Sequence, residues 1–325
     1  MKSRKNDGIL LFLHLKSLSL HLTRKLILLT YLLMKQNLRN VRKSLCSHLA
    51  WLLCGTALMA TMPMKAQTAA DSLAIVSATW QVQQVGRGLT GRQAVFSSLY
   101  GGPQCVSIVE IARGRKYRAG IGTSRQMKTL STLAREHKAV AAINGSYYDM
   151  GLGNSVTYLK VDENVVDTTT ANEFRIRVTG AVVARKGRLK IVPWSRSIEQ
   201  GYRKKVGTVL ASGPLMLKGG RYADWQQCDS DFIATKHPRS AIVVTKDRRV
   251  LLVTVDGRSP GNAIGMSIPE LAHLVKVLGG KTALNLDGGG STTLYLDGRI
   301  LNHPSDNRCF DHEGERQIPN MIFFR

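Results

Sequence analysis

The segment NLDGGGSTT, from Asn285 to Thr293, combines the residue types suited to binding and cleaving an anionic substrate. Its acidic residue Asp287 directly precedes three glycines, which allow positive φ and let backbone N–H groups approach a ligand closely. Successive N–H groups in such a turn form a concave anion site, and the hydroxyls that follow add donors. The segment therefore predicts an anion-binding loop beside a carboxylate. The alternative is a turn that needs glycine for its geometry alone.

Polar residues also follow or precede four other apolar segments. NGSYYD follows AVAAI, HPRS precedes AIVVT, DGR ends VLLVTV, and GER precedes the last apolar segment. Singly, each is an ordinary turn, since Asp-Gly and Asn-Gly are common turn dipeptides. Together they place three arginines, three aspartates, two asparagines and two tyrosines at the ends of expected strands. They are candidates for one site.

The elements that would position these residues are mostly strands. Residues 79–112 and 157–192 alternate polar and apolar positions in short segments, and 240–255 predicts a hairpin. One helix is expected to begin at Thr123-Ser124 and run through Ala134, and another at the capping box Ser267–Glu270. The glycine loop is expected to join a strand at 282–286 to one at 292–296. This order predicts an α+β fold with mixed or antiparallel sheets in a single catalytic domain.

The first 66 residues are expected to lie outside this domain. Residues 34–66 combine a basic segment, a short apolar core and a small residue for cleavage, which is typical of a signal peptide. The apolar core is too short for a comfortable membrane span. Residues 1–33 are interpreted as a gene-model extension or a long basic leader. The mature chain, 67–325, is expected to be periplasmic or extracellular, with no stable membrane span.

The charge balance favours an anionic partner. Lys and Arg outnumber Asp and Glu by 46 to 22, and residues 1–66 account for 11 of the basic residues and one Asp. Nucleic acid is not the expected partner, because no basic helix or helix-turn-helix pattern is present and export argues against it.

The cysteine pattern does not indicate a structural zinc site. Cys105, Cys228 and Cys309 remain after the leader and contain no Cys-x-x-Cys pair. An oxidising compartment would allow one disulfide and one free thiol, in a pairing that the sequence does not reveal. No cofactor or metal is predicted, although convergence of Asp149, Asp256 and Asp287 would supply metal ligands.

Eight motifs in series resemble the phosphodiester glycosidase family, bacterial relatives of the enzyme that uncovers mannose 6-phosphate on lysosomal glycoproteins. The motifs are NGSYYD (144–149), SGPLML (212–217), HPRSAI (237–242), VDGR (255–258), GMSIPELA (265–272), NLDGGGSTT (285–293), NHPS (302–305) and GERQIPN (314–320). They span roughly 139–325. Ser146, Tyr147 and Tyr148 replace the more usual Gly-Phe-Phe, and Ser212 replaces the commoner Gly. These departures bear on substrate preference.

The resemblance implies hydrolysis of a glycosyl phosphodiester, which releases the sugar and a phosphate monoester. A carboxylate stabilises the oxocarbenium-like centre, and arginines with backbone N–H groups neutralise the leaving phosphate. The catalytic candidates are Asp287, then Asp256, then Asp149. The substrate-binding candidates are Asn144, Tyr147, Tyr148, Arg239, Arg258, Asn285, Gly288, Gly289, Gly290, Ser291, Thr292 and Arg316. The implied substrate is a phosphorylated glycan or a small nucleotide-sugar-like molecule.

Two other functions stay open on the sequence alone. One is a binding module for phosphorylated or acidic glycans, which would use the same loop and arginines without a catalytic carboxylate. The other is a phosphodiesterase that breaks the P–O bond. Several candidates also have plain structural interpretations: Asp256 and Asp287 as turn formers, Arg258 as their ion-pair partner, and Glu270 as a helix cap.

Overall fold

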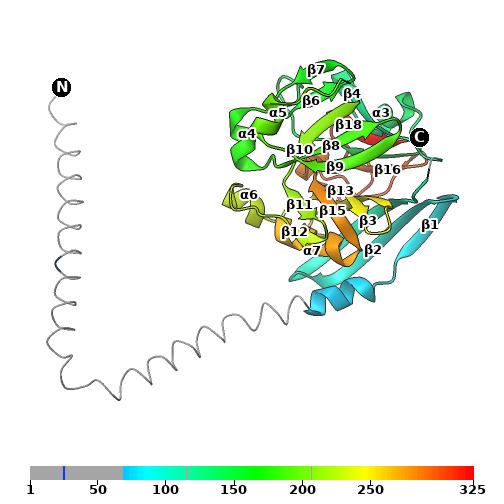
Figure 1. Cartoon of the computed structure of the whole chain (residues 1–325). Coiled ribbons are helices and arrows are strands. Elements are labelled where there is room, and N and C mark those ends of the chain that lie inside the picture. Colours follow the sequence, from blue (N-terminus) through cyan, green and yellow to red (C-terminus); the bar gives the residue numbers. More distant parts are fainter. Residues whose placement is uncertain (1–24, 26–68, 115, 206) are drawn as a thin grey trace, which may run out of the picture. The chain divides into compact units, whose positions relative to one another are not determined.

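The computed structural model describes Lys25 and residues 69–114, 116–205 and 207–325 (Figure 1). Contacts divide the chain into two units, Met1–Ala66 and Gln67–Arg325, and the second contains every element discussed below. The expected signal peptide at 34–66 lies outside the described residues, as does the segment 1–33 apart from Lys25.

Three sheets make up most of the unit Gln67–Arg325, and each strand pairing found in them is antiparallel. The largest has eight strands in the order β1 (Gln81–Gly86), β2 (Leu89–Leu99), β3 (Gly102–Ile111), β14 (Val250–Val255), β13 (Arg239–Thr245), β15 (Gly280–Asn285), β11 (Leu215–Lys218) and β12 (Arg221–Tyr222). The expected hairpin at 240–255 is confirmed as β13 and β14.

The two smaller sheets have five strands each. One follows the order β7 (Asn164–Asp167), β6 (Leu159–Val161), β10 (Thr208–Ser212), β8 (Gly180–Arg185) and β9 (Arg188–Pro193). The other follows the order β17 (Arg299–Ile300), β16 (Leu294–Leu296), β5 (Ala141–Asn144), β18 (Ile318–Phe324) and β4 (Ala119–Lys128).

The large sheet is buried on both faces, because alternate residues of its central strands enter different cores. Ile108 of β3 and Val253 of β14 pack beneath α7 (Ile268–Val277), whereas Val109 and Leu252 face the two smaller sheets. Side chains of a strand point alternately to opposite faces, so strands covered on both sides are apolar throughout. The fold is α+β with antiparallel sheets, as the sequence predicts.

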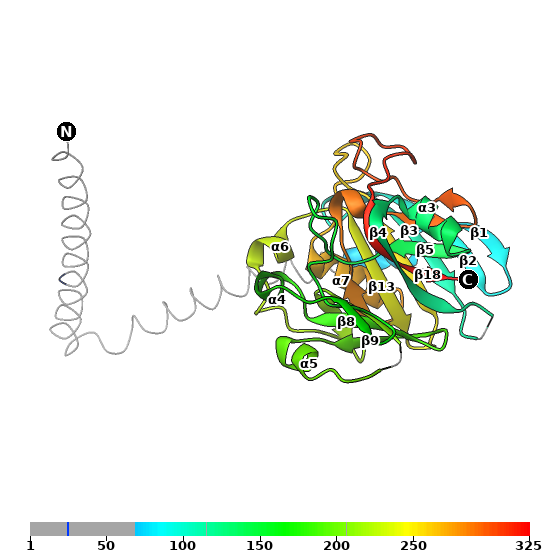
Figure 2. The same ribbon diagram turned by 90° about the horizontal axis from the view of Figure 1, so that it is seen from above.

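The helices are short and lie around the sheets. Besides α7 they are α3 (Leu130–Glu136), α4 (Ala171–Ile176), α5 (Arg196–Gln200), α6 (Ser230–Ala234) and the helical residues 69–76. The capping box of α7 is confirmed, since the Glu270 carboxylate accepts from the Ser267 N–H at 2.8 Å. Figure 2 shows α3 beside β5 and β18, where Leu130 and Leu133 are buried.

The helix expected to begin at Thr123-Ser124 begins later. Both residues lie in β4, where Thr123 pairs with Asn320 of β18. Thr129 is the N-cap of α3, and its hydroxyl accepts from the Thr132 N–H at 3.3 Å. Thr and Ser both favour the N-cap position, so Thr123, Ser124 and Thr129 are all candidate caps in the sequence. The pairing of β4 with the distant strand β18 decides that the helix begins after Thr129.

The glycine loop joins the large sheet to a smaller one. It leaves β15, forms a 3₁₀ turn η1 (Gly289–Ser291) and enters β16 at Leu294. The strand expected at 292–296 is therefore shorter, because Thr292 still closes the turn through its N–H to the Gly289 carbonyl at 3.2 Å. This position places the loop at a seam between sheets.

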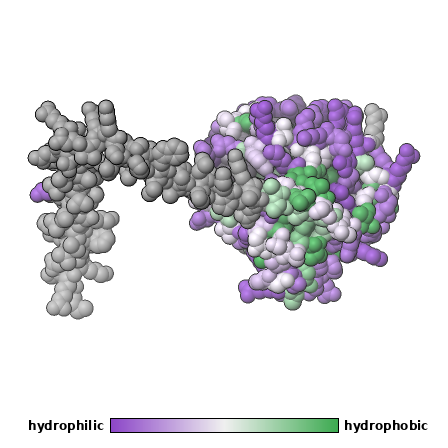
Figure 3. Space-filling model, turned by 90° about the horizontal axis from the view of Figure 1, so that it is seen from below, coloured by the Kyte–Doolittle hydropathy of each residue, from purple (hydrophilic) through white to green (hydrophobic). Residues whose placement is uncertain are grey.

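Large apolar side chains are exposed near the start of the described unit. Leu73 and Val76 of the helical residues 69–76, Val82 of β1 and Val95 of β2 are all more than 60% exposed. Figure 3 shows a face on which apolar surface gathers among hydrophilic residues. Within the described ranges, no helix has the length and apolar character needed to cross a membrane.

Candidate active site

The three loop glycines are required for different reasons. A Cβ on Gly288 would stand 2.6 Å from the Pro238 carbonyl oxygen, and one on Gly289, whose φ is +60°, would stand 2.8 Å from Nη2 of Arg258. A Cβ on Gly290 would overlap the guanidinium of Arg316. The loop backbone therefore passes directly against two arginines, which a side chain at these positions would push away.

Two of the loop N–H groups are already used inside the protein. The Gly288 N–H donates to the Asp287 carboxylate at 2.9 Å, and the Gly289 N–H donates to the Pro238 carbonyl at 2.9 Å. The expected row of free N–H donors is thus absent at these two positions. The guanidinium groups of Arg258 and Arg316 lie against Gly289 and Gly290 and supply donors there.

A cationic cavity of about 410 Å³ is lined by Arg258, Ser305, Asp306, Arg308 and Arg316. Arg316 donates through Nε to Asp306 at 2.7 Å and pairs with the same carboxylate through Nη2. Burial and repulsion from Arg316 lower the pKa of Arg258. Three arginines against one aspartate leave an excess of positive charge, so the cavity suits an anion.

Asp287 stands at the start of the loop with its carboxyl group largely desolvated. Burial raises the pKa of Asp287, while the hydroxyl of Ser291, the guanidinium of Arg177 and the Gly288 N–H oppose the rise. Its backbone is fixed by the Asn144 side chain, which donates to the Asp287 carbonyl at 2.7 Å. Asp287 is thus a carboxylate in a cationic setting beside the cavity-lining arginines.

The two asparagines are buried and hold strand ends together. Asn144 also accepts from the Ser240 hydroxyl at 2.6 Å and from the Thr293 N–H at 3.2 Å. Asn285 donates at 2.8 Å to the Tyr147 hydroxyl and to the Gly213 and Leu286 carbonyls. The structure does not place either side chain where it would reach a sugar hydroxyl in the cavity.

The adjacent tyrosines have different surroundings. Tyr147 is 3% exposed and its ring lies 3.6 Å from the Arg177 guanidinium, so it is a core residue and not an open stacking surface. Tyr148 is partly exposed and donates to the Gln317 carbonyl at 2.9 Å. Its pKa is raised by burial and by the nearby Asp287, which brings Tyr148 into the same cluster as the loop.

Two loop hydroxyls are buried near Asp287. Ser291 and Thr292 are each 1% exposed, and the Ser291 hydroxyl lies close enough to Asp287 and Tyr148 to oppose the rise of their pKa values. The Thr292 hydroxyl has no hydrogen-bond partner among the described residues, which is unusual for a buried hydroxyl.

Asp149 and Arg239 are occupied away from the cavity. Asp149 accepts from the Gly151 and Leu152 N–H groups at 2.8 and 2.9 Å, as a turn former does. Arg239 is 2% exposed and donates to the carbonyls of Met266, Phe232 and Thr235. The structure therefore brings neither residue to the site that the sequence suggested.

Asp256 is paired with a histidine that the sequence analysis did not single out. Asp256 is 1% exposed and accepts from His303 through Nδ1 at 2.8 Å and through the backbone N–H at 3.1 Å. The His303 ring stacks on Phe310, with centroids 3.9 Å apart. Its place in the NHPS motif was the available signal, but the pairing depends on residues 47 positions apart.

Cys105 joins this pair to form the one group in the described ranges whose donor atoms could hold a metal ion. The donor atoms of Cys105, Asp256 and His303 lie within 4.8 Å of one another. Burial raises the pKa of the Cys105 thiol, and thiol coordination requires the deprotonated form. Asp149 and Asp287 are not in the group. Cys105, Cys228 and Cys309 are all free thiols.

The sequence between residues 137 and 325 matches the family model described as phosphodiester glycosidase. The match covers more than half of the chain and includes the glycine loop, the three cavity arginines and the Asp256–His303 pair. The chain belongs to the phosphodiester glycosidase family.

Curated relatives of this phosphodiester glycosidase family member share low identity with it. N-acetylglucosamine-1-phosphodiester alpha-N-acetylglucosaminidase of Mus musculus is 26% identical over 197 residues, which cover 56% of this chain and 36% of the mouse protein. The Homo sapiens enzyme of that name is 24% identical over 225 residues, covering 61% of this chain and 40% of its own length. The chain thus spans well under half the length of these relatives.

Solved structures show the same fold. The zebrafish N-acetylglucosamine-1-phosphodiester alpha-N-acetylglucosaminidase catalytic domain, described as auto-inhibited by its pro-peptide, superposes with a TM-score of 0.58 at 19% identity. The alignment covers 77% of this chain and 89% of that domain. A hypothetical protein from Synechocystis gives a TM-score of 0.57 at 17% identity, covering 76% of this chain and 64% of its own.

Proposed function

We propose that this protein hydrolyses the glycosidic bond of a sugar 1-phosphodiester, the substrate class named in the mammalian relatives. The observation that supports this most directly is the Asp287 carboxyl group beside a loop whose glycines lie against Arg258 and Arg316. The reaction requires a carboxylate that stabilises the anomeric carbon and positively charged groups that bind the phosphate.

In the proposed reaction the bond between the anomeric carbon and the phosphate oxygen breaks. The phosphate leaves with the bonding electron pair, and Arg258 and Arg316 neutralise its charge. Asp287 stabilises the cationic carbon and either activates the attacking water or attacks first as a nucleophile. The products are the free sugar and a phosphate monoester.

Hydrolysis of an N-acetylglucosamine 1-phosphodiester in oxygen-18 water tests which bond breaks. We expect the label in the sugar and none in the phosphate monoester. Asp287→Asn keeps the shape of the side chain, so binding should persist while turnover falls by about two to four orders of magnitude. Label in the phosphate would identify a phosphodiesterase, and binding without any turnover by the unaltered protein would identify a binding module.

We also propose that the protein is exported, with the mature chain beginning near Gln67. The support is the basic, apolar and small-residue order of residues 34–66. N-terminal sequencing of the native protein tests this, and retention of residues 34–66 in a cytosolic fraction would contradict it.

A further inference from the structure

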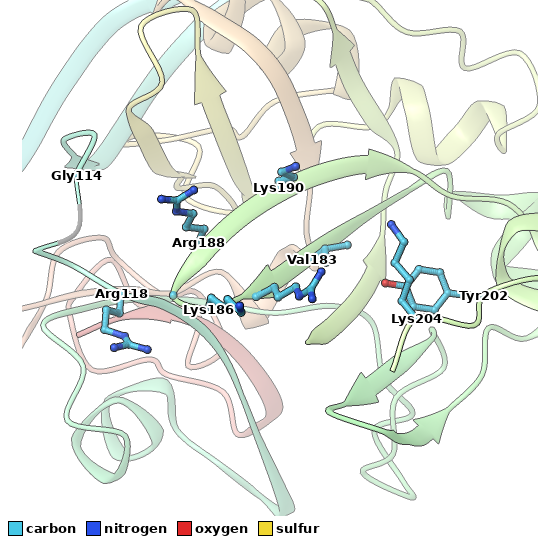
Figure 4. Close-up of a pocket in the computed structure, with 10 residues that line it drawn as sticks. Gly114, Arg118, Val183, Lys186, Arg188, Lys190, Tyr202 and Lys204 are labelled. Carbon is cyan, nitrogen blue, oxygen red and sulfur yellow. The ribbon is translucent and has the colours of Figure 1, made fainter. Parts of the chain in front are cut away.

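A second cavity, of about 730 Å³, lies along the hairpin β8–β9 and shares no lining residue with the cavity above the glycine loop (Figure 4). We call it the basic groove. Its cationic lining residues are Arg118, Arg185, Lys186, Arg188, Lys190 and Lys204. All six are exposed, and none forms an ion pair with another described residue. Its lining contains no Asp or Glu.

The strand register concentrates these charges on one face. Arg185 pairs directly with Arg188, and Val183 pairs with Lys190. Directly paired residues point to the same face, so the two arginines are neighbours, and like charges in this position are destabilising. The intervening Ala184 and Leu189 pack in the core on the opposite face. The fold therefore needs the apolar positions of this hairpin but gains nothing from its cations.

The turn of the hairpin is fixed against another sheet, which brings Arg118 to the groove. Lys186 and Gly187 have φ values of 51° and 73°, as a tight hairpin turn requires. The Gly187 carbonyl accepts from the Ala119 N–H at 2.9 Å, and a Cβ on Gly187 would stand 3.1 Å from that of Arg118. Arg118, which directly precedes β4, thus lies beside the cations of the hairpin.

An aromatic hollow continues from the groove. A neighbouring cavity, also of about 730 Å³, shares Val183, Lys190, Tyr202 and Lys204 with it. Tyr202 is partly exposed, and its ring is supported by Trp194 at a centroid distance of 5.3 Å. A supported aromatic ring beside cations offers an apolar surface for a sugar ring next to donors for its anionic groups.

We propose that the basic groove binds an anionic polysaccharide, at a site separate from the candidate active site. Sequence-tolerant nucleic-acid binding normally uses a series of exposed aromatic rings, and the groove and its hollow offer one partly exposed tyrosine among their lining residues. The inference does not depend on the proposed hydrolysis, since it requires binding alone.

Titration of the purified protein with a fluorescent heparin oligosaccharide tests the proposal. We expect binding that weakens steeply with salt. Arg185→Gln/Arg188→Gln/Lys204→Gln should bind about tenfold more weakly, as loss of three exposed charge contacts implies. The matched control Lys246→Gln/Arg248→Gln/Lys281→Gln removes three other exposed cations and should bind normally. Equal weakening by both variants would overturn the proposal, because net charge would then explain the binding.

The role of the sugar needs its own comparison. Tyr202→Leu removes the aromatic ring but retains apolar packing against Trp194. It should weaken heparin binding, because the sugar ring loses its contact surface, and leave binding of inorganic polyphosphate unchanged. Neutral dextran should not bind. A groove that binds a single-stranded oligonucleotide or anionic vesicles more tightly than heparin would be assigned to those partners instead. The groove triple variant should hydrolyse a small sugar phosphodiester at the normal rate if the two sites are separate.

Discussion

At the scale of the residue, the charge of Asp287 is expected to cost stability. Burial raises its pKa, so the folded protein binds a proton here more tightly than the unfolded chain. Such a group contributes to stability when protonated, and this contribution is lost as pH rises through the folded-state pKa. Asp287→Asn should therefore raise Tm at neutral pH, while the advantage should vanish below the ordinary pKa of an aspartate.

Thermal melts of both proteins across this pH range measure the effect. The Asn side chain can still accept from the Gly288 N–H, so the loop hydrogen bond is kept. A lower Tm for Asp287→Asn at neutral pH would mean that the surrounding arginines more than offset the burial of the charge. The same raised pKa predicts that turnover falls on the acid side at a higher pH than for an exposed aspartate.

Substitutions at two neighbouring glycines distinguish two reasons for glycine in the loop, namely backbone strain and close contact with the arginines. Gly290 lacks positive φ, so Gly290→Ala should leave the fold intact while its methyl group displaces Arg316, and kcat/KM should fall at least tenfold. Gly289→Ala also forces a side chain into a φ of +60°, which costs about 1–2 kcal/mol. We expect a lower urea midpoint for Gly289→Ala alone. Equal loss of stability in both variants would show that the loop shape, and not the arginines, requires glycine.

Sequence patterns predict which residues lie near the glycine loop better than they predict whether each side chain faces the cavity or the protein interior. The polar strand ends do converge, because β5, β14 and β15 end near the residues where β13 begins. Asn144, Asn285 and Arg239 nevertheless face inward. Whether a polar side chain at a strand end faces the interior or a cavity depends on strands far away in sequence, which local spacing does not encode.

At the scale of the element, Arg239 joins two segments across the edge of β13. Its guanidinium donates to carbonyls of α6 and of the segment before α7. Burial lowers the pKa of Arg239 to about 10, so it remains charged at neutral pH. Arg239→Met should cost about 3–5 kcal/mol of unfolding free energy, since three buried carbonyls lose a charged donor.

Urea unfolding of Arg239→Met beside Arg258→Met provides the comparison. Arg258 is exposed and lines the cavity, so its replacement should change the unfolding midpoint little. If Arg239→Met were as stable as the unaltered protein but inactive, the residue would belong to the substrate site after all.

Helices and strands whose start, end and apolar pattern are all visible in the local sequence can be predicted here. Those that depend on pairing with a distant strand cannot. α7 has a capping box, a proline in its first turn and an apolar stripe, and it forms where the sequence indicates. The spacing of Met127, Leu130, Leu133 and Ala134 fits a helix that begins at Thr123-Ser124, but residues 123–128 become part of β4 because β18 lies beside them. Helix α4 was missed because only six residues carry its pattern.

At the scale of the whole molecule, the candidate site lies where sheets join. The loop enters from β15 of the large sheet and leaves to β16 of a smaller one, and Asn144 of β5 fixes Asp287 across that boundary. An anion held by arginines over this loop would therefore connect elements of two sheets. Binding should stabilise the folded unit as a whole, because a ligand that binds only the folded state shifts the unfolding equilibrium.

Inorganic phosphate is a simple probe of this coupling. At about 100 times its Kd, phosphate should add about 2.7 kcal/mol to the free energy of unfolding, which corresponds to a rise in Tm of roughly 5–10 °C for a unit of this size. Arg258→Gln should lose most of this rise, since it removes one of the guanidinium groups that face the anion. The groove variant Arg185→Gln/Arg188→Gln/Lys204→Gln should keep it. If the groove variant lost the rise and Arg258→Gln kept it, phosphate would be stabilising the protein from the groove, and the glycine loop would have no demonstrated anion.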